Sequence, residues 1–232
     1  MRQLPLSVRL PDTARLASFV PGANEEVLHL LESIGNGAPR TIWLWGRTGS
    51  GKTHLLQAAC AAVAERGGTA CYLEPGPESS PEQIGGCESL DLVCLDRVER
   101  IAGAAAWNAA LFRLHTLMQD GAGRLLIAST LPPSAVEFVL PDLRSRLLAA
   151  SVHQLHELED VDLVAALQCR ARRRGLELGE EAALYLVHRL PRDMHSLMAV
   201  LDELDLASLA AQRRLTVPFL RQALETHSGE VG

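Results

Sequence analysis

A glycine-rich segment at residues 46–53 constrains this chain more than any other feature of its sequence. Residues 46–53 read Gly-Arg-Thr-Gly-Ser-Gly-Lys-Thr, which matches the nucleotide-binding pattern G-x-x-x-x-G-K-T. The loop follows an uncharged, β-branched and aromatic run at 41–45 and precedes a helical pattern at 54–64. A strand, this loop and a helix in that order form the context in which the motif binds phosphate. The sequence therefore predicts a nucleotide site in an α/β domain, and an ordinary glycine-rich turn is the alternative.

The residues of this loop have distinct predicted roles. Its glycines allow backbone N–H groups to turn towards phosphate oxygens, and the following helix adds the positive end of its dipole. Lys52 is expected to reach the β- and γ-phosphates, and the Thr53 hydroxyl is expected to bind Mg²⁺. The other residues of this segment that we expect to contact the nucleotide are Gly46, Thr48, Gly49, Ser50, Gly51 and His54.

The composition is that of a globular protein and argues against several classes of function. Of the 232 residues, 47% are apolar and 22% are charged, and the formal net charge is −6. Because duplex binding depends largely on neutralising phosphates, this charge argues against a protein that coats nucleic acid by itself. No apolar run reaches the roughly 18 to 20 residues of a membrane span, and no signal-peptide pattern opens the chain. We therefore expect a cytoplasmic protein with no membrane partner.

Neither the cysteines nor the histidines form a pattern typical of a metal site. The five cysteines are an odd number and contain no C-x-x-C pair, so we expect reduced core thiols rather than disulfides or a zinc site. The eight histidines contain no H-E-x-x-H motif.

Two domains are predicted from the order of the periodic segments. Strand-like runs at 41–45, 69–73, 92–96 and 124–129 alternate with helical patterns, which predicts a parallel sheet with helices on both faces over residues 13–157. Only helical patterns follow, so residues 158–232 are predicted to form a small all-α domain. Its expected helices are 160–174, 179–190, 192–212 and 217–226.

Asp96 is the second candidate of the nucleotide site. It ends a continuous apolar run at 92–96, which is typical of a central parallel strand, and an acid there can hold the Mg²⁺ shell opposite the phosphate loop. Hydrolysing P-loop proteins usually carry a second acid at the next position, where this chain has Arg97. A guanidinium cannot accept a proton, so we expect slow intrinsic hydrolysis. Glu99 is a conceivable replacement for the missing base, but we expect its side chain to point in a different direction.

The first twelve residues are predicted to form an extended arm, because they contain two prolines and no helical period. Within residues 1–12, the segment Gln3-Leu4-Pro5-Leu6 resembles the short peptide by which bacterial replication proteins bind the sliding clamp. An extended peptide with apolar anchors is suited to docking in a groove. A frayed tail without a partner is the alternative for this segment.

The chain resembles AAA+ ATPases of the DnaA branch over nearly its whole length. The resemblance rests on the phosphate loop, Asp96, the strand that ends before Thr130, the segment Asp142-Leu143-Arg144-Ser145-Arg146-Leu147 and the helical lid. It implies that Arg146 is an arginine finger, which is presented to the γ-phosphate bound on a neighbouring subunit. It also implies a nucleotide contact for Arg192, a sensor position for Thr130, and adenine-flanking positions for Phe19 and Val20.

Within this branch, the chain is similar to the regulators that inactivate DnaA. That similarity implies a negative regulator of replication initiation with ADP, or ATP, and Mg²⁺ as cofactors. The expected partners are DnaA and the sliding clamp, and DNA is contacted indirectly through the clamp. Association of this chain with further copies of itself is left open. A free-standing AAA+ ATPase such as a helicase loader is the alternative. A small-molecule kinase would need a site for the phosphate acceptor, and no group of residues in the sequence indicates such a site.

A basic cluster closes one of the expected lid helices. It consists of Arg170, Arg172, Arg173 and Arg174. Positive charge at this place complements the helix dipole, and contact with DNA threaded through a clamp is the alternative.

Overall fold

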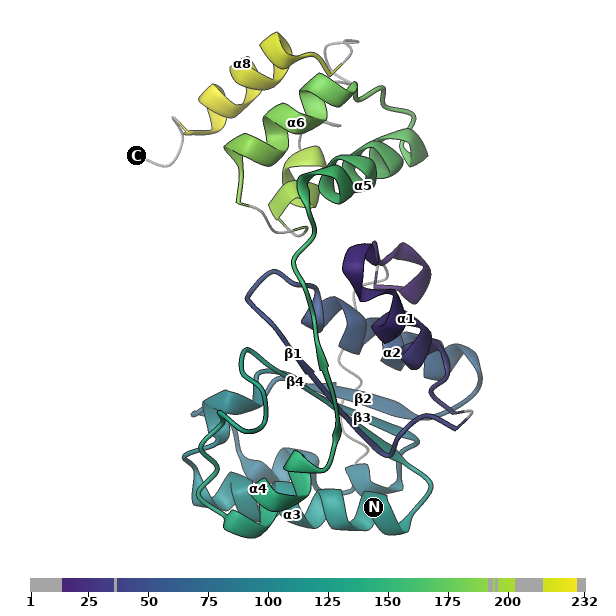
Figure 1. Ribbon diagram of the computed structural model, residues 1–232, viewed down its shortest axis with the longest axis vertical. Coiled ribbons are helices and arrows are strands. Elements are labelled where there is room, and N and C mark those ends of the chain that lie inside the picture. Colours follow the sequence, from purple (N-terminus) through teal and green to yellow (C-terminus); the bar gives the residue numbers. More distant parts are fainter. Residues whose placement is uncertain (1–13, 36, 192–193, 195, 203–214, 229–232) are drawn as a thin grey trace. The chain divides into compact units, whose positions relative to one another are not determined.

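The protein divides into two compact units in a computed structural model that describes residues 14–35, 37–191, 194, 196–202 and 215–228. The first, Met1–His156, is here named the α/β unit, and the second, Glu157–Gly232, the helical unit. The sequence places this division after residue 157 rather than after 156. Figure 1 shows the sheet of the first unit and the helices of the second.

The α/β unit is built on a five-stranded parallel sheet, as the alternating sequence pattern predicts. The strand order is β2-β3-β4-β1-β5, and each pair of neighbours is parallel. The phosphate loop therefore follows the strand that lies between β4 and β5. The strands are β1 (Thr41–Trp45), β2 (Ala70–Leu73), β3 (Leu92–Leu95), β4 (Arg124–Ser129) and β5 (Ser151–Gln154).

Both faces of this sheet are covered by helices, because alternate residues of each central strand point to opposite sides. Ile42 and Leu44 pack against α1 (Glu25–Glu32) and α2 (Lys52–Glu65) in one apolar core. Trp43, between them in β1, packs in a second core with α3 (Ala105–Asp120) and α4 (Pro141–Leu148). Figure 1 shows these two pairs of helices on opposite faces of the sheet. The continuous apolar runs of the central strands are therefore explained by burial on both sides.

Two elements of this unit are not evident in the sequence pattern. β5 reads Ser-Val-His-Gln and has partly exposed side chains, so it lacks the apolar run that marks the central strands. It is a strand because its backbone pairs with β1, with Ile42 opposite Ser151 and Trp45 opposite Gln154. α4 is only 8 residues long and buries Leu143 and Leu147. Such a short segment contains too few turns for a clear helical period.

The connection at 74–89 between β2 and β3 contains two short 3₁₀ helices. They are η3 (Pro81–Ile84) and η4 (Cys87–Ser89), and Ile84 and Cys87 are buried in the core on the α3 side of the sheet. All five cysteines are free thiols, and three of them, Cys60, Cys87 and Cys94, are buried. The expectation of core thiols is wrong for Cys169, which is exposed on α5.

The helical unit confirms the predicted all-α second part. It contains α5 (Asp160–Arg173), α6 (Glu180–Arg189) and α8 (Val217–Ser228), and residues 196–202 are also helical. The expected helix at 192–212 falls partly outside the described residues. The helices enclose their own apolar core, whose fully buried members include Leu163, Leu167, Leu186, Leu197, Leu201 and Leu220. No helix among the described residues is long and apolar enough to cross a membrane.

The central position of β4 leads to a test of the fold. Leu126→Ala should lower the free energy of unfolding of the α/β unit by about 2 to 5 kcal/mol, because Leu126 is fully buried and its removal leaves a cavity. Leu148→Ala is the matched control: Leu148 is 47% exposed, and its loss should change stability by less than about 0.5 kcal/mol. Urea unfolding followed by tryptophan fluorescence measures this unit alone, since the 3 tryptophans all lie before residue 157. Equal effects of the two substitutions would contradict the layered core.

Candidate nucleotide-binding site

The phosphate loop follows the carboxyl end of β1 and leads into α2. The backbone N–H of Gly46 donates to the carbonyl of Ser129, at the end of β4, over 3.3 Å. A Cβ at Gly46 would collide with the carbonyl oxygen of Leu155, so the close approach of these two segments requires glycine there. Gly49 and Gly51 have φ angles of 88° and 92°, in the left-handed region that glycine adopts at little cost. These glycine conformations, with the amino end of α2 behind the loop, are compatible with a phosphate cradle.

Lys52 lies inside this loop. Its side chain is buried, and Nζ donates to the carbonyls of Gly46 at 2.7 Å and Arg47 at 2.6 Å. Burial lowers the pKa of Lys52, whereas the negative charges of Asp96 and then Glu99 act in the opposite direction. Lys52 is also the only lysine in the sequence, beside 21 arginines among the 22 basic residues. Its compact ammonium group can donate to both loop carbonyls, whereas the guanidinium of an arginine is a larger, planar group.

Asp96 is fully buried at the end of β3 and accepts three hydrogen bonds. The donors are the Thr53 hydroxyl at 2.6 Å, the Tyr72 hydroxyl at 3.0 Å and the backbone N–H of Arg97 at 2.9 Å. These bonds satisfy a carboxylate that would otherwise be costly to bury. Hydroxyl and carboxylate oxygens are ligands that Mg²⁺ prefers, so Thr53 and Asp96 together fit a nucleotide-bound Mg²⁺. Among the described residues, no cluster of three His, Cys, Asp or Glu residues forms a metal site by itself.

Tyr72 is a member of this site that the sequence does not reveal. Burial, and then the charge of Asp96, raise the pKa of its hydroxyl, which keeps it a hydrogen-bond donor at neutral pH. The position of Tyr72 near the carboxyl end of β2 is the signal that places it near other strand ends.

Phe19 and His54 meet at the amino end of α2. Their rings stack with centroids 5.9 Å apart, and a Cβ at Gly51 would lie only 2.8 Å from Cε2 of Phe19. Burial lowers the pKa of His54, although a hydrogen bond to the carbonyl of Arg15 opposes this effect. Phe19 thus lies beside the phosphate loop, and Val20 follows it as a partly buried residue. The adenine-flanking role that the resemblance implies for both stays a prediction. Arg192 and the segment Gln3 to Leu6 lie outside the described residues.

Arg97, the residue after Asp96, forms an ion pair with the nearby acid Glu74. Its backbone has a φ of 52°, and its guanidinium forms an ion pair with Glu74 over 3.2 Å. Arg100 binds the same carboxylate oxygen of Glu74 over 3.1 Å. The residue after Asp96 therefore contributes a cation that is already paired. Glu99, two residues later, turns to Thr130 instead.

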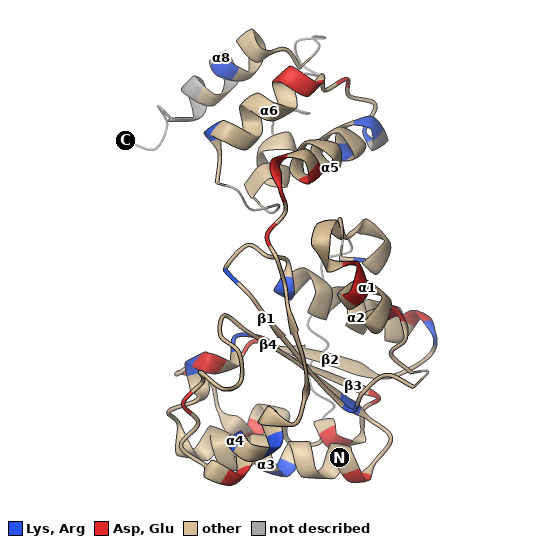
Figure 2. Cartoon of the chain, viewed as in Figure 1, with Lys and Arg blue, Asp and Glu red and all other residues tan. Residues whose placement is uncertain are grey.

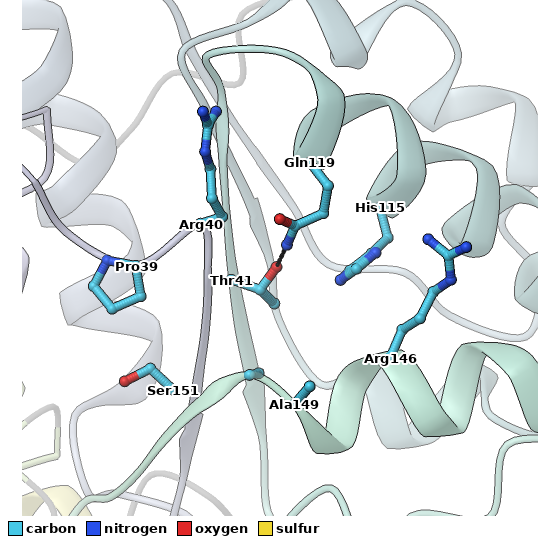
Figure 3. Close-up of a pocket in the computed structure, with 9 residues that line it drawn as sticks. Pro39, Arg40, Thr41, His115, Gln119, Arg146, Ala149 and Ser151 are labelled. Atoms are coloured by element: carbon cyan, nitrogen blue, oxygen red, sulfur yellow. Dashed lines mark hydrogen bonds between the residues drawn. The ribbon is translucent and has the colours of Figure 1, made fainter.

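Arg146 lies near the amino ends of β1 and β5, whereas the phosphate loop follows the carboxyl end of β1. It is exposed near the end of α4, and it lines a pocket of about 530 Å³ together with Thr41, at the amino end of β1, and Ser151, at the amino end of β5. Figure 3 shows this pocket, whose other lining residues are Pro39, Arg40, His115, Gln119, Ala149 and Ala150. The five residues of β1 separate the pocket from the phosphate loop by roughly 15 Å, at about 3.3 Å per residue. Arg146 is therefore not part of the phosphate cradle in its own chain.

The Arg146 side chain rests on α3. Its guanidinium carbon lies 4.5 Å from the centre of the Phe112 ring, and Nη1 donates to the Thr116 hydroxyl over 3.1 Å. Next to it, burial and then the positive charge of Arg146 lower the pKa of His115. This geometry holds the guanidinium at the surface, where another molecule can reach it.

The basic cluster of α5 is partly explained by contacts within the helical unit. Arg174 forms an ion pair with Asp202, and Nε of Arg172 donates to the carbonyl of Gln168 over 3.3 Å. Figure 2 shows blue segments at the carboxyl end of α5, where positive charge complements the helix dipole.

Known proteins resemble both the α/β unit and the helical unit of this chain. Residues 160–224 match the model of the family described as Hda, lid domain. Domain III of the replication initiation protein DnaA from Thermotoga maritima superposes with a TM-score of 0.78 at 18% identity, over 94% of this chain and 98% of that chain. The predicted resemblance is thus confirmed by the lid-domain match and by structural similarity to DnaA.

Two further solved structures share the fold. AMPPCP-bound DnaA from Aquifex aeolicus superposes with a TM-score of 0.73 at 21% identity, covering 85% of this chain and 66% of the DnaA chain. A RuvB mutant from Thermotoga maritima gives a TM-score of 0.71 at 17% identity, over 94% of this chain and 72% of that one. This chain spans slightly less than two thirds of the Aquifex protein. These likenesses confirm an AAA+-like α/β core followed by a helical lid.

The position of Lys52 leads to a binding test. Lys52→Ala should weaken ADP binding about ten- to a hundredfold, because a charged hydrogen-bond donor to phosphate is lost. Isothermal titration calorimetry with ADP and Mg²⁺ measures the change. Arg113→Ala, which removes an exposed positive charge from α3, is the control and should leave the affinity as it is. Unchanged affinity of the Lys52 variant would exclude this loop as the nucleotide site.

Proposed function

We propose that this chain is a negative regulator of DNA replication initiation that stimulates ATP hydrolysis by DnaA. In this proposal the loop between β1 and α2 holds a nucleotide, which is ADP in the regulatory state, together with Mg²⁺. The N-terminal arm binds the DNA-loaded sliding clamp, so that DNA is reached through the clamp. Arg146 then enters the ATP site of a DnaA molecule as a finger supplied in trans.

The observation that carries the proposal is the location of Arg146. Its guanidinium is exposed at the edge of the α/β unit opposite the phosphate loop, so it has no role at the nucleotide of its own chain. An arginine at this place is available to a neighbouring molecule. The match of residues 160–224 to the Hda lid family supports a regulator of the DnaA system over other AAA+ proteins.

The contacts that hold Arg146 on α3 are weak enough to be exchanged. A cation–π contact with Phe112 at an exposed site contributes about 0.5 to 1 kcal/mol, and a single hydrogen bond about 1 kcal/mol. An arginine finger accelerates phosphoryl transfer by about 10³- to 10⁵-fold, because it stabilises charge that develops on the phosphate oxygens. That acceleration corresponds to about 4 to 7 kcal/mol, so the gain at the partner site exceeds the loss on α3.

A slow nucleotide site of its own is compatible with this role. Arg97 occupies the position where hydrolysing relatives carry a water-orienting acid, and its guanidinium binds Glu74. A protein that uses bound nucleotide to set its conformation gains nothing from rapid turnover. Lys52, Thr53 and Asp96 nevertheless retain the arrangement for binding phosphate and Mg²⁺.

That retained arrangement favours one competing function, a free-standing AAA+ ATPase such as a helicase loader. The two functions differ in whether the purified chain hydrolyses ATP without DnaA. Fast turnover by the chain alone would favour the free-standing enzyme.

The trans role of Arg146 is tested by substitution. Arg146→Ala should reduce clamp-dependent ATP hydrolysis by DnaA to the rate measured without this chain, since the charge at the γ-phosphate is lost. Release of phosphate from ATP-loaded DnaA, with clamp and DNA present, measures this effect. The variant should still bind ADP with normal affinity.

Arg144→Ala is the matched control for Arg146. Arg144 is also an exposed arginine of α4, but its guanidinium donates to the carbonyl of Ser134 over 3.2 Å, away from Phe112. This variant should keep most of the stimulation. Full stimulation by the Arg146 variant would contradict the finger assignment, and equal loss in both variants would point to general damage of α4.

The clamp contact is tested with the N-terminal arm, which lies outside the described residues. Deletion of Gln3 to Leu6 should abolish retention of this chain by immobilised sliding clamp, because the apolar anchors of the peptide are removed. Arg9→Ala, a change in the same arm outside the motif, should be retained like the unaltered chain. If the deletion variant is retained equally well, the arm is not the clamp-binding segment.

A further inference from the structure

Four of the five cysteines form two close pairs in the part of the sheet that contains β2 and β3. Sγ of Cys71 lies 3.7 Å from Sγ of Cys87, and Sγ of Cys60 lies 3.4 Å from Sγ of Cys94. Cys71 and Cys87 pack in the core on the α3 side of the sheet, whereas Cys60 and Cys94 pack in the core on the α2 side. The sheet therefore keeps the two pairs apart.

The two pairs differ in what covers them. Cys60 lies within α2, a helix of 14 residues, and Cys94 lies in β3 between two other strands, so both are deeply buried. Cys71 is a partly exposed residue of the edge strand β2, and Cys87 begins η4, which has only 3 residues. Both glycines that precede Cys87 are exposed. Because a short surface turn opens locally at a smaller cost than a helix packed on a sheet, an oxidant reaches the Cys71–Cys87 pair more easily.

The hydrogen bond within this pair favours its oxidation. The thiol of Cys71 donates to Sγ of Cys87, and this bond lowers the pKa of Cys87, although burial and then the charge of Glu88 oppose the effect. The same bond, and then burial, raise the pKa of Cys71, which therefore keeps its proton. In thiol oxidation a thiolate is the nucleophile, and a second thiol nearby converts the resulting sulfenic acid into a disulfide. The pair thus combines a reactive sulfur with a resolving one.

We propose that Cys71 and Cys87 are a redox-sensitive site that forms a reversible disulfide with a peroxide as the oxidant. The thiolate of Cys87 attacks one oxygen of hydrogen peroxide, the O–O bond breaks, and the hydroxide that leaves takes up the proton lost by Cys87 to give water. The sulfur of Cys71 then attacks the sulfenic acid on Cys87, the S–O bond breaks, and the hydroxyl leaves with the Cys71 proton as a second water. The two sulfurs together lose two electrons to the peroxide, and a dithiol reductant reverses the step.

The disulfide ties the connection between β2 and β3 to the edge of the sheet. The two cysteines are 16 positions apart in the sequence, and closing a loop of this size restricts the unfolded chain. The oxidised α/β unit should therefore unfold at a higher urea concentration than the reduced one. Tyr72, which follows Cys71, donates to Asp96, so the link forms beside a strand end of the candidate nucleotide site.

The link is tested by peptide mapping of the full chain after treatment with hydrogen peroxide. Remaining thiols are blocked with N-ethylmaleimide, and the chain is cut with a protease that cleaves after glutamate. Each of the four paired cysteines then lies on a peptide of its own, because they are separated by Glu65, Glu74, Glu82 and Glu88. Mass spectrometry should find the Cys71 peptide joined to the Cys87 peptide, at least about tenfold more often than the Cys60 peptide joined to the Cys94 peptide. Dithiothreitol should separate the joined peptides and reverse the shift in urea unfolding.

The controls use the other cysteines of the chain. Cys169 is exposed on α5, so its oxidation shows that the peroxide has acted. Cys87→Ser should abolish the joined peptides and the shift in urea unfolding, whereas Cys60→Ala should keep both.

The unaltered chain alone decides the outcome, whether or not a variant folds. If Cys169 is oxidised while Cys71 and Cys87 stay unlinked, or if the link between Cys60 and Cys94 predominates, the inference is overturned. The link requires neither nucleotide nor DnaA, so its outcome is independent of the proposed function.

Discussion

The site depends on one buried carboxylate, that of Asp96. It lies at the end of β3 with no exposed surface, and it receives hydrogen bonds from Thr53 on α2, Tyr72 on β2 and the backbone of Arg97. These bonds connect the helix behind the phosphate loop to two strands of the sheet. Since a buried carboxylate cannot lose its donors without a large cost, they also hold Thr53 and Asp96 in the arrangement that fits a nucleotide-bound Mg²⁺. The cradle is thus held by the core of the sheet rather than by the loop alone.

The parallel sheet separates two chemical ends of one unit. The carboxyl ends of its strands carry Lys52, Asp96 and Glu99, whereas Arg146 is exposed near the amino ends of β1 and β5. A nucleotide bound at the first end cannot contact the arginine at the second. In our proposal this separation allows the chain to hold its own nucleotide with little turnover while it offers a guanidinium to another molecule.

The sequence predicts a phosphate site because the motif that identifies it is local. The spacing of residues 46–53 identifies the loop, and the apolar run before Asp96 identifies a central strand. β5 could not be predicted, because its pairing with β1 and not its polar residues makes it a strand. The bonds of Asp96 with Tyr72 and of Glu99 with Thr130 join residues 24 and 31 positions apart, which no local pattern encodes. The roles given to Arg146, Arg192 and the N-terminal arm stay predictions.

The central claim is that α4 of this chain meets the γ-phosphate of an ATP bound to another protein. The most direct measurement uses an ATP analogue with a photoreactive group on its γ-phosphate, loaded onto DnaA before this chain, clamp and DNA are added. After illumination, mass spectrometry locates the crosslinked residues. The account predicts crosslinks to this chain within Pro141–Leu148, around Arg146. Crosslinks confined to DnaA, or to the phosphate loop of this chain, would contradict it.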